Sequence, residues 1–577
     1  MQKNSQNIDT IRHSLAHILA MAVLKNSPKA KLGIGPVIEN GFYYDFSLPG
    51  PITDKDLPEV EKTMREIIAQ KLDFAGENVT PAKAKKLFKD QPFKLELIRD
   101  FVKEKKELSV YRTGGDFFDL CRGGHVENTA EIPPDAFKLV SVAGAYWKGS
   151  EKNDMLTRIY ALAFGSKAEL EKHLALLEEA KKRDHKRLGQ ELDLFTFSDL
   201  VGPGLPLWTP KGTILRNILD DFVWKLRKER GYQQVDIPHI TKKDLYERSG
   251  HWEKFKNELF KIETREGHIF AMKPMNCPHH TQIFARRLWS WRDMPQRYAS
   301  TTKVYRDEQT GELAGLARVR AITQDDAHVF CRQSQAKEEI LKIWDIVHEF
   351  YGKAGFSLRT RLSLSDPENP GSYLGSPGVW KKAEGMLREI LKEKNSDAFE
   401  AIGEAAFYGP KIDFLASDSL GREWQVATIQ LDMNLPERFD LSCINEKGER
   451  ERIVMIHAAI MGSIERYLSI LIEHFAGAFP FWLAPTQILI TTVNDSVQSY
   501  AEEIEKRLEA QGVRVELDLR NETIGKKIRE AELQKIPYIL VIGPREKDSG
   551  TIAVRERTKG DQGTFTLEKF LASIPQG

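Results

Sequence analysis

The sequence predicts a multidomain protein with α+β and α/β parts, and three observations lead to this fold class. The chain has 577 residues, which is too long for one hydrophobic core when domains usually contain roughly 100–200 residues. Helical periodicity and β-type runs are mixed through most of the chain. After Ala484-Pro485, β-type runs are separated by amphipathic helices, which is typical of an α/β domain with a largely parallel sheet.

Composition excludes several classes of protein. The chain is 41% hydrophobic and 29% charged, and no run approaches the roughly 18–20 apolar residues that cross a membrane. The first ten residues lack the apolar core of a secretory signal, so we expect a cytoplasmic protein with no membrane contact. Lysine plus arginine (85) and aspartate plus glutamate (84) nearly cancel, so a nucleic-acid partner would have to bind local basic patches.

The first domain is expected over residues 1–165, with α+β structure. Apolar residues at helical spacing predict a helix over residues 8–25, and His13 and His17 share one face of it. Glycine- and aromatic-rich segments follow, which predict short strands and tight loops. The next stretch, 166–190, is interpreted as a linker helix, because a solvated surface explains its basic second half better than contact with a phosphate backbone.

Residues 191–484 mix long helices with β-type runs and are expected to form a large sheet-centred domain. Within it, Arg306, Glu308, Arg318 and Arg320 surround a glycine-containing turn. Two strands joined by such a turn could aim guanidinium groups at a phosphate, because planar bidentate donors suit that charge. Surface arginines on a hairpin would explain this segment equally well.

A second segment places Gly462, Glu465 and Arg466 at the start of an apolar helix. We expect Arg466 at the buried edge of a helix packed on a sheet, where a charge needs an anionic partner. Pro238 after an earlier helix, the arginine hairpin and this helix follow one another as the three motifs of class II aminoacyl-tRNA synthetases do. The chain resembles that family.

This resemblance implies an antiparallel-sheet catalytic core that binds ATP and forms an aminoacyl-adenylate. Such chemistry needs positioning and charge stabilisation rather than a protein nucleophile. The catalytic residues that it implies are Arg306, which would hold the α-phosphate and the amino acid carboxylate, Arg466 and Lys411. The ATP-binding residues, with Mg²⁺ accompanying the nucleotide, would be Arg306, Glu308, Arg318, Gln425 and Arg466.

The sequence segments around three further residues resemble the segments around the zinc ligands in the threonyl-tRNA synthetase family. The resemblance to this family extends from residue 8 to the end of the chain. It implies that Cys277, His328 and His457 hold Zn²⁺, although each alone would be an ordinary core residue. Three protein ligands leave open positions on zinc. Threonine could fill them with its amino and hydroxyl groups, whereas valine has no hydroxyl. The implied threonine-binding residues are Gln324, Asp326, Tyr408, Thr428 and Gln430.

Serine lacks only one methyl group of threonine, a difference worth about 1–3 kcal/mol, so a second site is needed to reject it. His13-x-x-x-His17 and Cys121-x-x-x-His125 resemble the residue pairs of the editing domain that threonyl- and alanyl-tRNA synthetases share. The four residues could form a zinc site. The resemblance to the threonyl branch favours metal-free hydrolysis of Ser-tRNA(Thr), in which the assisting residues would be Tyr44, Lys94 and Asp119.

Residues 485–577 resemble the anticodon-binding domain of the same family through the strings DLRNETIGKKIRE and VIGPRE. Base contacts are implied for Asn521, Glu546 and Arg555, since single-stranded RNA is usually recognised through unstacked base edges. The whole resemblance implies a threonine–tRNA ligase (EC 6.1.1.3) of bacterial type that acts on ATP, L-threonine and tRNA(Thr). It also implies a homodimer, because the first class II motif usually builds a dimer interface.

The chain departs from the family pattern in several places. The small domain that usually precedes the editing domain is not expected here. Ala458 replaces the arginine that is usual after the third zinc ligand. Glycines that are common in the motifs are replaced by Ala161, Ala321 and Ala427. These replacements could lower catalytic efficiency. Two alternatives remain open, an RNA-binding protein that no longer catalyses and a synthetase for proline or serine. The first predicts loss of the motif arginines or zinc ligands, and the second predicts loss of the pairing between the two Cys/His sets.

Overall fold

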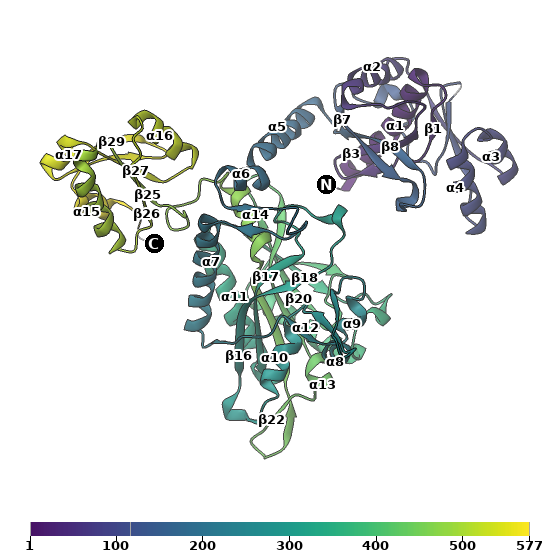
Figure 1. Ribbon diagram of the computed structural model, residues 1–577. Helices are drawn as coiled ribbons and strands as arrows, with labels where there is room; N and C mark the ends of the chain where they lie inside the picture. The colour runs from purple at the N-terminus through teal and green to yellow at the C-terminus, as the bar shows by residue number, and fades with distance from the viewer. Residues whose placement is uncertain (1, 116, 576–577) are drawn as a thin grey trace. The chain divides into compact units, whose positions relative to one another are not determined.

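Figure 1 presents the computed structural model of the chain, which describes residues 2–115 and 117–575. The chain forms two compact units, residues 1–178 and residues 179–577. None of the helices in the described ranges is long and apolar enough to cross a membrane. Each unit has its own buried hydrophobic clusters.

The first unit, purple to blue in Figure 1, packs helices against an antiparallel sheet. The helix predicted over 8–25 is confirmed within α1 (Gln2–Asn26), where Leu15, Leu19 and Val23 recur at helical spacing and are buried. The other helices are α2 (Leu57–Ile68), α3 (Pro81–Leu87) and α4 (Pro92–Lys103). The larger sheet has the order β1-β3-β8-β7, with β2 paired to β3: Lys31–Leu32, Gly41–Ser47, Met155–Ala163, Phe137–Tyr146 and Val37–Ile38. A smaller sheet contains β4 (Phe74–Asn78), β5 (Ser109–Thr113) and β6 (Phe117–Leu120).

The stretch predicted as one linker helix is two helices. The first is α5 (Lys167–Arg183) and the second is α6 (His185–Glu191). Asp184 separates them, because its side chain accepts hydrogen bonds from the backbone N–H groups of Lys186 and Arg187. Aspartate is among the most favoured residues at the N-cap position of a helix, so a new helix begins after Asp184.

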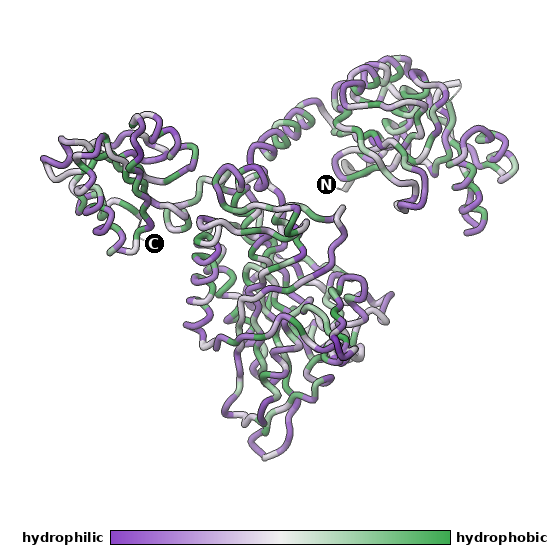
Figure 2. The backbone as a smooth tube through the Cα atoms, viewed as in Figure 1, coloured by the Kyte–Doolittle hydropathy of each residue, from purple (hydrophilic) through white to green (hydrophobic). Residues whose placement is uncertain are grey.

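The second unit is built on an eight-stranded sheet with the order β11-β16-β17-β24-β21-β20-β18-β19. Neighbouring strands are antiparallel except for the pair at each edge, which confirms the predicted antiparallel core. The strands, in that order, are Gln233–Gln234, Gln296–Tyr305, Ala321–Cys331, Val454–Ser463, Glu423–Asp432, Lys411–Ser417, Leu358–Leu364 and Phe399–Ile402. Hydrophobic residues, green in Figure 2, run along the central strands.

Helices and small sheets complete this part of the unit. The hydrophobic residues of α7 (Pro210–Glu229), α11 (Ala336–Lys353), α12 (Pro377–Glu393) and α14 (Ile464–His474) share one buried cluster with the central strands. Elements nearer the predicted zinc ligands are α8 (Lys243–Ser249), α9 (His251–Lys254), α10 (Cys277–Phe284) and α13 (Asn434–Arg438). Two three-stranded sheets are β12-β14-β13 (Ile240–Lys242, Ile269–Met272, Lys261–Glu263) and β15-β22-β23 (Trp289–Ser290, Ser442–Ile444, Arg450–Arg452).

The C-terminal sheet has the order β26-β25-β27-β28-β29 and is mixed rather than largely parallel. Its strands are Val515–Asp518, Ile488–Thr492, Tyr538–Ile542, Ile552–Glu556 and Gly560–Phe565. The first three are parallel and are linked by α15 (Gln498–Glu509) and α16 (Ile524–Leu533). Parallel neighbours need a connection of about a dozen residues or more. The segment between β27 and β28, which contains only α17 (Pro544–Ser549), is shorter, so β28 returns antiparallel.

Candidate functional sites

Three neighbouring strands of the eight-stranded sheet carry two of the predicted zinc ligands and most of the predicted threonine-binding residues on one face. Side chains alternate along a strand, so residues two apart in β17, β24 and β21 point to the same side. The pairing register aligns these residues in two rows that continue onto β20. The first row is His328, His457, Gln430 and Lys411. The second row is Asp326, Ala459, Thr428 and Asp413.

Cys277, at the start of α10, joins the first row from outside the sheet. Its Sγ and one ring nitrogen from each of His328 and His457 lie within 4.8 Å of one another, and all three residues are buried. His328 Nε2 is 3.0 Å from His457 Nδ1. Burial lowers the pKa of His328 and raises the pKa of the Cys277 thiol, so the imidazole is neutral and a cation is needed to hold a thiolate. Sulfur and imidazole ligands are those that zinc prefers.

Some buried polar atoms close to this cluster lack a hydrogen-bond partner within the described chain. Gln324 Oε1 and Thr428 Oγ1 are buried and have no partner among the described residues. Asn276 Nδ2 donates to Asp326 Oδ2 at 3.1 Å. An unsatisfied buried polar group costs about 1–3 kcal/mol, so this arrangement indicates a site for a polar ligand.

Tyr408 contacts two residues of the first row, Gln430 and His457. Its hydroxyl donates to Gln430 Oε1 at 2.5 Å, and its ring stacks on that of His457 with 4.7 Å between centroids. The structure therefore brings the predicted threonine-binding residues and the three predicted zinc ligands to one face of the sheet.

A cavity of about 670 Å³ opens beside the second row. The predicted ATP-binding residues line it, together with two of the predicted threonine-binding residues: Arg306, Glu308, Arg318, Gln425, Arg466, Gln324 and Thr428. The hairpin of β16 and β17 carries the first three, as the sequence predicts. Arg306 Nε is buried without a partner among the described residues, and burial lowers the pKa of its guanidinium. Arg318 donates two hydrogen bonds to Glu308 Oε2, at 2.9 and 2.6 Å.

The predicted burial of Arg466 is wrong. Arg466 is exposed at this cavity, 5.9 Å from the centroid of the Trp424 ring, and the buried residue is Glu465. Glu465 accepts hydrogen bonds from Thr323 N and Thr323 Oγ1, both at 2.7 Å. Adjacent helical residues point about 100° apart, so one faces the sheet and the next faces the cavity.

Two residues that sequence reasoning missed hold Lys411 and the cavity-lining residue Gln425 in place. Asp413 is buried, and it binds Lys411 Nζ at 3.1 Å and Gln425 Nε2 at 2.8 Å. Arg361 donates to Asp413 Oδ2 at 2.9 Å and to Gln425 Oε1 at 2.7 Å. Lys411 and Gln425 are thus fixed by one carboxylate. Alternation along β20 was the available signal, since Asp413 lies two residues after Lys411.

The alanines that depart from the family pattern are all buried: Ala161, Ala321, Ala427 and Ala458. The carbonyl of Ala458 accepts a hydrogen bond from Arg227 of α7 at 3.3 Å, and the same guanidinium pairs with Asp325 at 3.1 Å. A buried arginine therefore lies beside Ala458, although it comes from another element.

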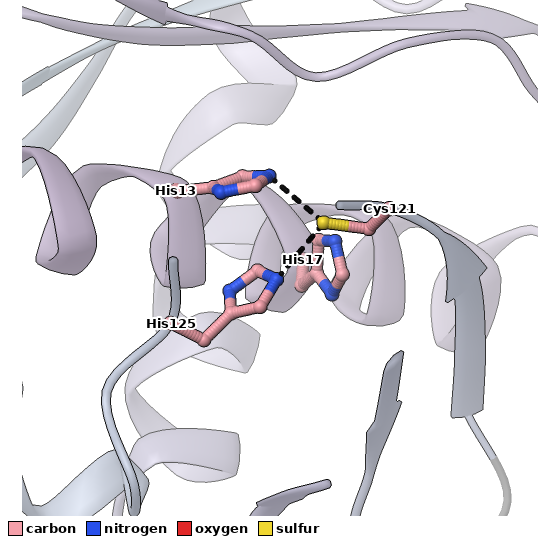
Figure 3. A group of neighbouring side chains, drawn as sticks. All are labelled: His13, His17, Cys121 and His125. Atoms are coloured by element: carbon pink, nitrogen blue, oxygen red, sulfur yellow. Dashed lines mark hydrogen bonds between the residues drawn. The ribbon is translucent and has the colours of Figure 1, made fainter. Parts of the chain in front are cut away.

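The first unit contains a second cluster, shown in Figure 3. His13 and His17 come from α1, and Cys121 and His125 come from the loop after β6. Cys121 Sγ is 3.3 Å from His13 Nε2 and 3.2 Å from His125 Nε2. One ligand atom from each of the four residues lies within 4.8 Å of the others. The donor set could hold a metal ion or orient a water molecule.

Burial keeps this cluster uncharged. It lowers the pKa of His17 well below the ordinary value, lowers the pKa of His125 to about 2 and raises the pKa of the Cys121 thiol to about 11. The imidazoles are therefore neutral near pH 7 and the thiol is protonated. Without a metal, Cys121 is a poor nucleophile, because the thiolate is the reactive form.

A buried ion pair lies beside His17 of this cluster. Lys94 Nζ is paired with Asp119 Oδ1, and the Tyr44 hydroxyl donates to Asp119 Oδ2 at 2.5 Å. His17 Nε2 is 3.8 Å from the same oxygen. A cavity of about 310 Å³ is lined by six of the seven predicted editing residues: His13, His17, Tyr44, Lys94, Asp119 and Cys121. The seventh, His125, contacts Cys121 as described above.

The predicted anticodon residues do not form one cluster. Asn521 follows β26 and Glu546 follows β27, so both lie at the carboxyl edge of the parallel strands. Glu546 Oε2 accepts a hydrogen bond from Gly543 N at 2.9 Å and so stabilises the start of α17. Arg555 lies on β28 opposite Ile539, near the other end of β27, and its Nε is buried without a partner in the described chain.

Comparisons with known proteins agree with these parts of the chain. Residues 260–475 match the tRNA synthetase class II core domain (G, H, P, S and T), residues 487–576 match the anticodon binding domain, and residues 108–160 match the threonyl and alanyl tRNA synthetase second additional domain.

Two curated relatives and one solved structure are similar over long stretches. The threonine–tRNA ligase of Gloeobacter violaceus is 49% identical, covering 100% of this chain and 93% of the relative. That of Acetivibrio thermocellus is 47% identical, covering 98% and 88%. The crystal structure of the RNA binding domain of threonyl-tRNA synthetase from Cryptosporidium parvum is 37% identical with a TM-score of 0.65, covering 68% of this chain and 99% of that one.

The ion pair in the first unit gives a testable stability prediction. Asp119→Leu leaves Lys94 charged and buried without a partner, so it should destabilise the first unit by about 3–5 kcal/mol. The double variant Lys94→Met/Asp119→Leu should recover most of this loss, because an apolar pair of similar volume needs no counter-ion. Amide hydrogen exchange of residues 1–178 in the intact chain measures both effects.

The exposed pair of Lys83 and Glu77 provides a matched control, and Glu77→Leu should leave the exchange unchanged. Equal destabilisation by the single and double variants would contradict this account of the buried pair.

Proposed function

The chain belongs to the threonine–tRNA ligase family, whose reaction is the ATP-dependent ligation of L-threonine to tRNA, and we propose that Cys277, His328 and His457 select the amino acid by holding a zinc ion. The observation that carries this proposal is the convergence of one sulfur and two ring nitrogens within 4.8 Å. Membership of this family argues against a proline or serine synthetase, and the presence of every motif arginine argues against an inactive relative.

The donor set fits zinc in number and kind. Three protein ligands are typical of a zinc site that also binds a substrate. Zinc bound there would offer open positions to the amino and hydroxyl groups of threonine, and the side chain of valine could not fill the second of them. Asp326, held by Asn276, would accept the hydrogen bond of the threonine hydroxyl. Gln324 and Thr428, whose oxygens lack partners in the described chain, would contact the same molecule, and Tyr408 and Gln430 would close the pocket.

The cavity beside this pocket would hold ATP together with Mg²⁺. The guanidinium of Arg306, whose buried Nε has no partner among the described residues, would pair with the α-phosphate and the threonine carboxylate as the adenylate forms. Arg466, which is exposed over Trp424, would clamp the nucleotide. Glu308 would hold Arg318 toward the outer phosphates, and Asp413 would hold Lys411 and Gln425 toward the reacting groups.

The cluster of the first unit would hydrolyse Ser-tRNA(Thr). Neutral imidazoles of His13, His17 and His125 can accept a proton from water, whereas the protonated Cys121 is suited to hydrogen bonding rather than to nucleophilic attack. The buried group of Tyr44, Lys94 and Asp119 would fix the orientation of His17. This proposal assigns no metal to the cluster, in contrast to the zinc site of the catalytic core.

The proposed division of the chain follows these sites. Residues 1–165 would form the editing domain, 166–190 the linker, 191–484 the catalytic domain and 485–577 the anticodon-binding domain. Each of the three family matches falls inside one of these segments. ATP and tRNA as substrates make the cytoplasm the proposed site of action. A homodimer is proposed because β11, just before Pro238, is an unpaired edge of the large sheet within the described chain, and light scattering should give twice 65.9 kDa.

The zinc proposal predicts a loss of both metal and activity in Cys277→Ser. The variant should lose its stoichiometric zinc and its threonine-dependent ATP–pyrophosphate exchange. The unchanged protein should favour threonine over valine by about 10⁴-fold, because a site built to bind a hydroxyl strongly rejects an analogue that lacks one. Cys443→Ser is the matched control, since Cys443 is buried in β22 outside the cluster and should leave both properties intact. Comparable exchange with valine in the unchanged protein would overturn the proposal.

The editing proposal predicts that His17→Ala slows hydrolysis of Ser-tRNA(Thr) by about 10²-fold or more, as expected when a proton acceptor is lost. Threonine-dependent exchange should be unaffected, because His17 lies in the other compact unit. His173→Ala, on α5 outside the cluster, should behave like the unchanged protein. Hydrolysis of Ser-tRNA(Thr) by the unchanged protein should persist after treatment with a chelator. If the chelator abolishes hydrolysis, the cluster requires a metal ion.

The anticodon proposal predicts that Asn521→Ala raises the KM for tRNA(Thr) by about tenfold or more, which corresponds to about 1–3 kcal/mol for a lost base contact. Glu546→Ala should also loosen α17, because Glu546 supports the start of that helix. Exchange without tRNA should not change in Asn521→Ala, and an unchanged KM would remove Asn521 from the interface.

A further inference from the structure

Each of the two sheet histidines in the proposed zinc site turns its second ring nitrogen toward a buried partner. His457 Nε2 is 2.9 Å from Asp432 Oδ2, and His328 Nδ1 is 2.8 Å from His280 Nδ1. Asp432 and His280 are themselves buried. The proposed function gives neither of these partners a role.

Asp432 determines which nitrogen of His457 carries the proton. Its other oxygen, Oδ1, accepts hydrogen bonds from Asn434 N at 2.8 Å and Leu435 N at 2.9 Å, so the carboxylate is fixed at the end of β21. An ionised carboxylate only accepts hydrogen bonds, so His457 must donate from Nε2. Its Nδ1 is then unprotonated, and this is the nitrogen that lies 3.0 Å from His328 Nε2.

His280 offers His328 a buried partner of the same kind, through a chain of hydrogen bonds. It lies three residues after Cys277 on α10, and its Nε2 is 3.2 Å from Ser300 Oγ. If His328 donates from Nδ1, His280 accepts at Nδ1 and donates from Nε2 to the Ser300 hydroxyl, so that each ring has one consistent tautomer. His328 Nε2 is then also unprotonated. Two such nitrogens 3.0 Å apart repel each other, and a cation would relieve that repulsion.

We propose that Asp432 and His280 are positioning residues that hold His457 and His328 in the tautomers whose unprotonated nitrogens meet at the zinc site. This inference rests on the proposed zinc-binding function and extends it beyond the three ligands. Partners of this kind fix ring orientation and typically contribute about 10–100-fold to metal affinity. The neighbouring His279 provides a contrast, because neither of its buried ring nitrogens has a partner among the described residues.

The test measures the zinc dissociation constant of the full chain by competition with a chromogenic chelator, without any assay of activity. His280→Leu removes the acceptor for His328, and Asp432→Asn removes the charge while keeping the shape of the side chain. Both should weaken zinc binding by about 10–100-fold. His280→Asn should bind within a few-fold of the unchanged protein, because its Oδ1 can replace Nδ1 as the acceptor. His279→Gln is the matched control and should bind as tightly as the unchanged protein.

Replacement of zinc by Co²⁺ adds a spectroscopic readout, since the visible absorption of bound Co²⁺ reports the geometry of its ligands. The spectrum should change in Asp432→Asn and in His280→Leu and should be unchanged in His279→Gln. The unchanged protein could bind zinc while Asp432→Asn and His280→Leu bind it as tightly as the unchanged protein does. In that case the positioning role is wrong, and the zinc site itself is unaffected. If the unchanged protein binds no zinc, the proposed function itself fails. Should His280→Leu not fold, Asp432→Asn still decides the outcome.

Discussion

The pairing register of β17, β24 and β21 is the constraint on which the catalytic site depends. Adjacent antiparallel strands bring directly opposed side chains close together, so His328 and His457 meet although 129 positions separate them in the chain. A slip of one residue in any of these strands would turn its polar residues to the opposite face. The hydrophobic cluster behind the sheet prevents such a slip, because Ala327, Val329 and Ile456 would lose their burial.

Neighbouring carboxylates make the two sites chemically different, although burial has the same effect on the histidines and cysteines of both. In the catalytic core, desolvation leaves the His328 imidazole neutral, and the acidic groups Asp326 and Asp432 lie close enough to favour a bound cation. In the first unit, the carboxylate of Asp119 is already paired with Lys94, so the cavity above it contains polar groups without excess charge. One arrangement is suited to a metal ion, and the other is suited to orienting water and an ester.

Local signals in the sequence predicted much of this structure. The first helix, the hairpin of Arg306 and the apolar helix that begins near Arg466 follow from periodicity and turn residues. The break at Asp184 was missed because a strong helix pattern continues across it, and the antiparallel return of β28 depends on connection length rather than on strand composition. The resemblance to a family supplied the ligand sets that spacing could not.

The remaining residues could not be found without the fold. Asp413, Asp432 and His280 act through partners that the sheet register or helix packing brings to them, and nothing in their local sequence distinguishes them from ordinary buried polar residues. Glu465 is buried in place of the predicted Arg466 because of how α14 is rotated about its own axis. Such details are set by tertiary packing.

Anomalous diffraction at the zinc absorption edge, from crystals of active protein, tests the central claim most directly. We expect one strong peak per chain between Cys277 Sγ, His328 Nε2 and His457 Nδ1, with metal–sulfur and metal–nitrogen distances of about 2.3 and 2.0–2.1 Å. A map without a peak at that point, or with zinc only among His13, His17, Cys121 and His125, would contradict the account.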